Sequence, residues 1–148
     1  MTKPGVATKA ATSPAEYAAL VVNAKNPSGK PVTIKANNMY YVQKTIEISA
    51  AHNLMLSYES KCEDLHGHNW IIVVYCKAEK LNADGMVTDF THIKRIVKDT
   101  FDHKYINEVL DVNPSAENLA KWICDHVENC YKVSVQESEG NIAIYERD

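Results

Sequence analysis

Three histidines in the middle of the chain have the residue type and spacing of a catalytic metal centre. His66 and His68 are two positions apart, so on a β-strand both imidazoles point to the same side. His52, fourteen residues before His66, supplies a third imidazole if its own strand lies alongside. Three neutral nitrogens suit Zn²⁺ and leave one coordination position open for water or substrate. The pattern predicts a catalytic zinc centre, although a His-X-His pair taken alone is more often ordinary.

Cys62, four residues before His66, is open to two interpretations. As a fourth ligand, its thiolate would close the site and make the zinc structural. Its neighbours Lys61, Glu63 and Asp64 are polar, which instead suits a partly exposed thiol. A nearby cation lowers the pKa of a cysteine toward neutrality, where the thiol serves as a base or nucleophile. The spacing alone leaves both interpretations standing.

Two further positions carry candidate chemistry. Asp102 and His103 are adjacent; such a pair is usually a solvated helix end, but a carboxylate that fixes the tautomer of an imidazole makes it a better proton carrier. Glu137 shares strand parity with Val133 and Val135, so it lies on an apolar side where the strand ends. It is either a turn residue or an acceptor of two parallel N–H bonds from an amidine-like ligand edge.

Two strands are expected to position the histidines. In the first, Ile46, Ile48 and His52 share one parity, so His52 faces the same side as the apolar residues. The second runs from His68 to Cys76 and is apolar at both parities. A strand that is apolar on both faces needs cover on both. We expect helices on one face and another subunit on the other.

The rest of the chain predicts two helices and a hairpin. Thr88 or Asp89 caps the first helix, and Ser115, after Pro114, opens the second. The hairpin pairs residues 131–137 with 141–146 around a turn at 138–140. The inner faces are expected to hold Phe90, Ile93, Val97 and Phe101 in the first helix, and Leu119, Ile123, Val127 and Cys130 in and after the second. The order β-β-α-α-β-β predicts an α+β fold with antiparallel pairs.

Composition narrows the classes of partner. Apolar residues make up 45% of the 148 and charged residues 24%, which is ordinary for a globular protein. A net charge of −3 gives no basic footprint, so nucleic acid is not expected as a partner. No apolar run approaches a membrane span and the N-terminus lacks a signal-peptide core, so a cytoplasmic location is expected. In that compartment the four cysteines are expected to be thiols, with Cys76, Cys124 and Cys130 as packing residues.

A compositional boundary lies near residue 38. Four of the five prolines fall within the first 31 residues. Ser13-Pro14-Ala15-Glu16 has the form of a capping box with proline at the first helical position. We therefore expect residues 1–38 to be an N-terminal extension with a short helix, and residues 39–148 to be the catalytic domain.

Taken in order, these motifs resemble the 6-pyruvoyl-tetrahydropterin synthase superfamily over residues 41–148. The three-residue gap between Cys62 and His66 is similar to the 6-carboxy-5,6,7,8-tetrahydropterin synthases of the queuosine and 7-deazapurine pathway; the animal 6-pyruvoyl enzymes have a longer gap. Residues 1–38 match nothing in the family pattern. The resemblance rests on the following segments: Ala50-Ala51-His52, Cys62 with His66-Gly67-His68-Asn69, Gly85 to Phe90, Asp102-His103 with Asn107, Asn113 to Asn118, and the Glu137 strand.

The resemblance implies a T-fold (tunnelling fold), in which three subunits close a barrel and two trimers stack into a hexamer. It implies that Zn²⁺ is bound by three histidines, that Cys62 is the proton-transferring thiol with Asp102 and His103 as its partner pair, and that Glu137 anchors a pterin. In the family the site forms between subunits, so Cys62 and His103 are expected to face each other across an interface. The implied histidine ligands are His52, His66 and His68.

The implied substrate is 7,8-dihydroneopterin triphosphate, converted to 6-carboxy-5,6,7,8-tetrahydropterin, acetaldehyde and triphosphate by a lyase. Three alternatives stand beside this reaction. One is 6-pyruvoyl-tetrahydropterin synthase or sepiapterin-processing activity in the same superfamily. The second is a non-catalytic domain with a closed Cys-His₃ structural zinc. The third is a pterin-binding protein without turnover, against which Cys62, Asp102 and His103 argue.

Overall fold

The computed structural model describes residues 27–30 and 38–148 of the chain. Contacts divide the chain into two units, Met1–Asn38 and Met39–Asp148. The short helix predicted after Ser13 lies outside the described residues. No described helix is long and apolar enough to cross a membrane.

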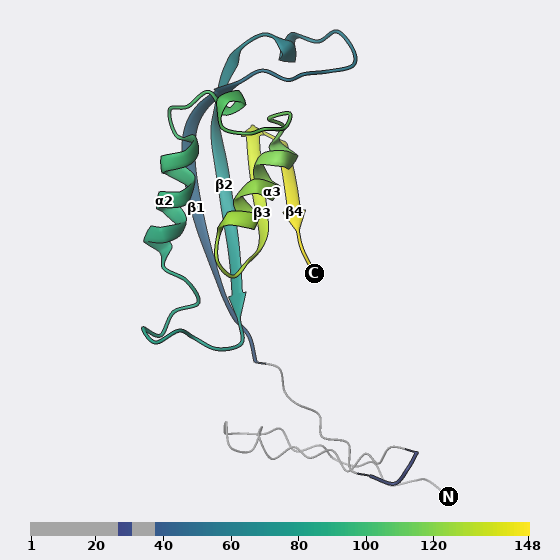
Figure 1. Ribbon diagram of the computed structural model, residues 1–148, viewed down its shortest axis with the longest axis vertical. Coiled ribbons are helices and arrows are strands. Elements are labelled where there is room, and N and C mark those ends of the chain that lie inside the picture. The colour runs from purple at the N-terminus through teal and green to yellow at the C-terminus, as the bar shows by residue number, and fades with distance from the viewer. Residues whose placement is uncertain (1–26, 31–37) are drawn as a thin grey trace, which may run out of the picture. The chain divides into compact units, whose positions relative to one another are not determined.

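Four strands form one antiparallel sheet in the order β1-β2-β3-β4 (Figure 1). Helix α2 packs on β1, and helix α3 packs on β3 and β4. The predicted order β-β-α-α-β-β is therefore confirmed. The elements are β1 (Tyr40–His52), β2 (His66–Ala78), α2 (Phe90–Phe101), α3 (Ala116–His126), β3 (Cys130–Ser138) and β4 (Asn141–Glu146).

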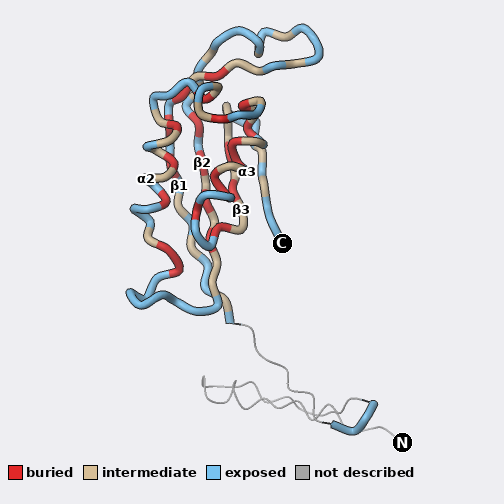
Figure 2. Tube along the Cα trace, viewed as in Figure 1, coloured by how far each residue is buried: buried red, intermediate tan, exposed pale blue. Residues whose placement is uncertain are grey.

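The register of the sheet sorts its side chains onto two faces. In β2, Trp70, Ile72 and Val74 are fully buried beneath the helices, as the period of two requires. Burying each such side chain stabilises the fold by about 1.5–3 kcal/mol. Ile71 and its neighbours of the other parity stay partly exposed within this chain, and Figure 2 shows the alternation along the strands. Cover on that second face by another subunit remains a prediction.

The two helices begin at the predicted caps. The side chain of Asp89 accepts a hydrogen bond from the amide of Thr91 at 2.7 Å, and Ser115 caps α3 in the same way. Ile93 lies on the buried stripe of α2, as do Val97 and Phe101. The inward position predicted for Phe90 is wrong, because its side chain is 48% exposed. Side chains lean toward the N-terminus of a helix, so the first residue projects past the part that covers the sheet.

The remaining core positions follow the prediction. Leu119 and Ile123 are buried on α3, and Val127 is buried just after it. Cys130 is also buried, but it begins β3 rather than extending the helix. Cys76, Cys124 and Cys130 are free thiols within the core, which confirms them as packing residues.

Candidate metal centre

Four side chains from three strands converge at one end of the sheet. His52 is the last residue of β1, and it lies opposite His66, the first residue of β2, in the antiparallel register. His68 is two positions further along β2 and faces the same way. Glu137 comes from the end of β3. One ligand atom from each of the four lies within 4.8 Å of the others, so the cluster has the donor set of a metal site.

Backbone carbonyls fix two of the imidazole tautomers. The Nδ1 of His52 lies 2.7 Å from the carbonyl oxygen of Pro114, and the Nδ1 of His66 lies 2.7 Å from that of Asp64. A carbonyl oxygen only accepts, so each Nδ1 must carry the proton and donate it. The Nε2 of a neutral ring is then a free lone pair, which is the form that ligates metal.

The spacing of the inner nitrogens fits a cation between them. The Nε2 atoms of His52 and His66 are 3.1 Å apart, and in the tautomers above both present lone pairs. Two nitrogens bound tetrahedrally to one zinc at 2.0–2.1 Å lie roughly 3.3 Å apart, so the spacing fits an ion. The Nε2 of His68 is buried without a hydrogen-bond partner, although Glu137 Oε1 is 2.8 Å away. That oxygen is close enough for an ion pair but is not aligned as an acceptor.

The setting of His68 favours its neutral imidazole. Burial lowers the pKa of His68; Glu137 opposes this effect, and the neighbouring His52 and His66 add to it. The buried ring of Trp70 packs edge-on against His52 and His68, with centroids 4.9 and 5.2 Å away. The indole N–H donates to the carbonyl of Ala50 at 3.1 Å, which fixes this wall of the site. A neutral His68 ring against this apolar wall presents a lone pair that can ligate a metal.

Glu137 lies closer to the histidines than the sequence indicated. The pairing of β3 with β4 is irregular between Gln136 and Ser138, and such a bulge re-aims the residue within it. Its carboxylate oxygen is 2.8 Å from His68 and 3.5 Å from His52. Strand parity placed Glu137 on the apolar face correctly. Its proximity to the histidines depends on the pairing of β2 with β3, which no local pattern specifies.

Cys62 lies outside the cluster of four. It sits in a 3₁₀ turn, Lys61–Glu63, within the loop that joins β1 to β2 beyond the end of the sheet (Figure 1). Ser60 caps this turn by accepting from the amide of Cys62 at 3.2 Å. The thiol is half-buried. Among the residues that the structure describes, the group beside the three histidines that could ligate a metal is Glu137 and not Cys62, so the cluster offers no support for a closed Cys-His₃ site.

Asp102 and His103 form the predicted pair at the end of α2. The Asp102 Oδ1 accepts from the amide of Ser49 at 3.0 Å and lies 3.2 Å from the Nδ1 of His103. The Ser49 hydrogen bond lowers the pKa of Asp102, and the nearby Lys98 adds to the effect. His103 has a φ of 57°, which is uncommon for a residue other than glycine, and its side chain is 83% exposed. Its amide donates to the carbonyl of Ser49 at 2.7 Å, which holds this conformation.

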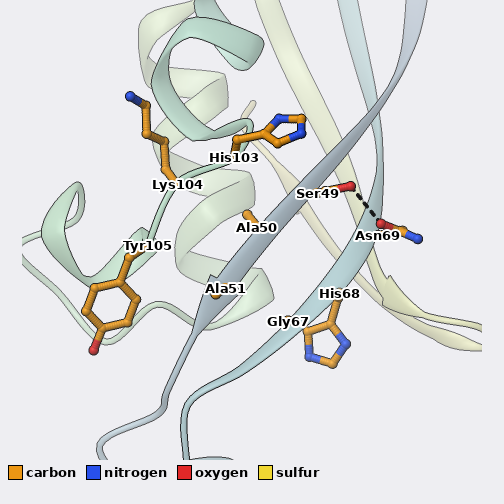
Figure 3. A pocket seen from close by; sticks show the side chains of 9 residues that line it. All are labelled: Ser49, Ala50, Ala51, Gly67, His68, Asn69, His103, Lys104 and Tyr105. Atoms are coloured by element: carbon orange, nitrogen blue, oxygen red, sulfur yellow. Dashed lines mark hydrogen bonds between the residues drawn. The ribbon is translucent and has the colours of Figure 1, made fainter.

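An open pocket of about 540 Å³ is lined by both His68 of the metal cluster and His103. Figure 3 shows His103 and Lys104 beside β1, with His68 on β2. Gly67 and Asn69 complete the β2 side of the pocket. Cys62 is not among the residues that line it. Within one chain, the structure thus brings His103 to the same pocket as His68 and leaves the thiol elsewhere.

The sequence model of the family described as 6-pyruvoyl tetrahydropterin synthase matches residues 41–148. The chain belongs to this family. The solved structure of Caenorhabditis elegans 6-pyruvoyl tetrahydropterin synthase superposes with a TM-score of 0.62 at 25% identity, covering 78% of this chain and 100% of that one. The predicted T-fold is confirmed, and a pterin synthase-type enzyme is supported.

Curated relatives carry two names. A 6-carboxy-5,6,7,8-tetrahydropterin synthase of Synechocystis is 36% identical over 57% of this chain and 72% of that protein. The 6-pyruvoyl tetrahydrobiopterin synthase of Homo sapiens is 30% identical over 70% of this chain and 89% of that protein. A Pyrococcus horikoshii relative is 47% identical, but the match spans 42% of this chain and only 38% of that protein.

Proposed function

We propose that the protein converts 7,8-dihydroneopterin triphosphate and one water molecule to 6-carboxy-5,6,7,8-tetrahydropterin, acetaldehyde and triphosphate, as a zinc-dependent lyase. The observation that carries the proposal is that the Nε2 atoms of His52 and His66 lie 3.1 Å apart, beside a buried His68 Nε2 that has no hydrogen-bond partner. The 6-carboxy relative from Synechocystis and the short gap between Cys62 and His66 favour this reaction within the family.

His52, His66 and His68 are the proposed zinc ligands. In His52 and His66, the hydrogen bond from Nδ1 to a backbone carbonyl holds the Nε2 atom inward. In His68, packing against Trp70 does the same. A Zn²⁺ bound there supplies a Lewis acid that lowers the pKa of a substrate hydroxyl.

Cys62 and the Asp102–His103 pair are the proposed proton carriers. Cys62 removes a proton from the substrate side chain, and His103, oriented by Asp102, delivers or accepts the complementary proton. Loss of triphosphate, addition of one water molecule and a retro-aldol-like cleavage between the first and second side-chain carbons then release acetaldehyde and leave the carboxyl group on the pterin. Glu137 is the proposed anchor, because a carboxylate accepts two parallel N–H bonds from the amidine edge of a pterin.

A homohexamer built from two trimers is the proposed assembly. The sheet has β1 and β4 at its edges, and Ile142 and Ile144 on β4 are 56% and 60% exposed. Barrel closure between copies pairs such edges and covers such side chains. An interface between subunits also offers a way for Cys62 to meet His103. The proposed location is the cytoplasm, where a catalytic thiol stays reduced, with no membrane or nucleic acid as partner.

The test is product analysis. Purified zinc-loaded protein is incubated with 7,8-dihydroneopterin triphosphate, and the products are identified by mass. Equal amounts of 6-carboxytetrahydropterin and acetaldehyde are expected, and the chelated protein serves as the control. Triphosphate release with a 6-pyruvoyl product and no acetaldehyde would establish the second candidate, which the human relative favours. Absence of any turnover would leave neither activity standing.

Chelation separates both enzymes from a structural-zinc domain. Removing a catalytic ion should leave a folded but inactive protein, whereas removing a structural ion should unfold it. Circular dichroism before and after chelation makes this distinction.

A further inference from the structure

Two asparagine side chains hold the start of the loop that carries Cys62. Asn107 accepts from the amide of Asn53 at 3.0 Å and donates to the carbonyl of the same residue at 2.8 Å. Asn113 makes the matching pair with Met55, at 2.9 Å in both directions. Each amide therefore satisfies both backbone groups of one residue, as a neighbouring strand would.

The residue between these two clamped positions faces the other way. Residues 53 and 55 bind the asparagines, and by the alternation of an extended chain Leu54 turns its backbone to the opposite side. The amide of Leu54 donates to the carbonyl of Cys62 at 2.8 Å. The amide of Cys62 is in turn held by Ser60 at 3.2 Å. Both backbone groups of Cys62 are thus bound, one of them to a segment that the asparagines fix.

The asparagines come from the segment that also carries His103. Asn107 is four residues after His103, in the 3₁₀ turn Ile106–Glu108. The carbonyl of Lys104 accepts from the amide of Ala51 at 3.0 Å, so this segment is fixed to the end of β1. Asn113 is itself held, because its carbonyl accepts from the side chain of Asn118 at 2.9 Å. The asparagines therefore connect a segment that is hydrogen-bonded to β1 with the loop that carries Cys62, and they are placed to position that loop.

We infer that Asn107 and Asn113 are positioning residues for the thiol of Cys62, acting through residues 53–55. The inference rests on the proposed function, in which Cys62 transfers a proton. Neither asparagine needs to touch the substrate. A misplacement of about 1 Å at a reacting group costs about 100-fold in rate, so loosening this support should lower kcat without weakening binding.

The experiment compares Asn107→Ala and Asn113→Ala with Asn82→Ala. Asn82 is the matched control, because its side chain also accepts two backbone amides, from Asp84 and Met86 at 3.0 Å, but in the loop after β2. We expect kcat to fall by about 10- to 100-fold in the two test variants, with KM, zinc content and Tm close to those of the control. Asn107→Asp keeps the acceptor and removes the donor, and it serves where the alanine variant does not fold.

Alkylation of Cys62 by iodoacetamide, followed by peptide mass mapping over a range of pH, gives a readout independent of turnover. The other three thiols are internal references, since all are buried and burial raises the pKa of Cys124 to about 11. The pH profile or rate of Cys62 alkylation should change several-fold in both test variants and stay at the wild-type value in Asn82→Ala.

Each result has one meaning. A fall in kcat no larger than in the control, or an unchanged alkylation profile in both test variants, would overturn the inference. If the wild-type protein turns over no pterin triphosphate, the proposed function fails, and the alkylation of Cys62 still decides whether the asparagines position the thiol.

Discussion

The metal cluster and the proton-transfer residues are built in different ways. His52 is fully buried at the end of a paired strand, and its partners His66 and His68 are fixed by the same register. His103, by contrast, is 83% exposed at the end of a helix, and Cys62 lies in a loop. Strand pairing thus fixes the first group, while backbone hydrogen bonds to neighbouring segments fix the second.

A single chain brings the metal cluster together, but it does not bring Cys62 and His103 together. The three proposed histidine ligands and Glu137 converge within a single copy, with one potential ligand atom from each inside 4.8 Å. The thiol does not line the pocket that His103 lines. Metal binding should therefore be a property of the folded chain, whereas turnover should depend on surfaces brought from outside it. Substitutions of the histidines should therefore remove metal binding, whereas substitutions of the proton-transfer residues should lower turnover and leave the metal in place.

The largest effect is expected from His52→Ala. It removes one of three nitrogen ligands and leaves the buried carbonyl of Pro114 without its donor, which costs about 1–3 kcal/mol of stability. Zinc content and turnover should both be lost, and Tm should fall. Elemental analysis and thermal melting measure this. A variant that keeps its full zinc content would contradict the ligand assignment.

Cys62→Ala should have the second largest effect, and this effect should fall on turnover and not on zinc binding or stability. Turnover should drop by about 10²–10⁴-fold, because a positioned acid or base contributes that much. Zinc content and Tm should stay at the wild-type values, since the thiol lies outside the cluster. Loss of zinc in this variant would make Cys62 a ligand and would remove the contrast between the two regions.

Glu137→Gln tests whether this carboxylate binds the pterin or the metal. If Glu137 anchors the pterin, the substitution should raise KM by about 10-fold, because one charge-assisted pair of hydrogen bonds weakens. The kcat and the zinc content should change little. Steady-state kinetics and elemental analysis give the answer. A loss of zinc would instead assign the carboxylate, 2.8 Å from His68, to the metal.

Asp102→Asn should destabilise the fold less than His52→Ala does, and that effect should depend on pH. The pKa of Asp102 is lowered in the folded chain, so its contribution is present above the ordinary carboxyl pKa and is lost as pH falls through the folded value. The variant should be less stable than the wild type by about 1 kcal/mol near neutral pH, and the difference should vanish in acid. Urea unfolding at several pH values measures it. A difference that grows in acid would contradict this.

Local patterns predicted much of the molecule. Alternation predicted that His66 and His68 face one side and that His52 faces the apolar side of its own strand. The caps Asp89 and Ser115 were predictable from residue type. The failures share a cause. The approach of Glu137 to His68 depends on the β2–β3 register, and the support of Met55 depends on a contact 58 residues away in sequence. Neither leaves a periodic signal.

The absence of a side chain between His66 and His68 has a practical consequence. A methyl group on Gly67 would meet only the carbonyl of Ala50 at 3.6 Å, an ordinary contact, and the residue is exposed at the pocket. Folding therefore does not require glycine here. A Gly67→Cys substitution in the Cys62→Ala background, where no partly exposed thiol competes among the described residues, could carry a fluorescent or spin label that reports the binding of a ligand.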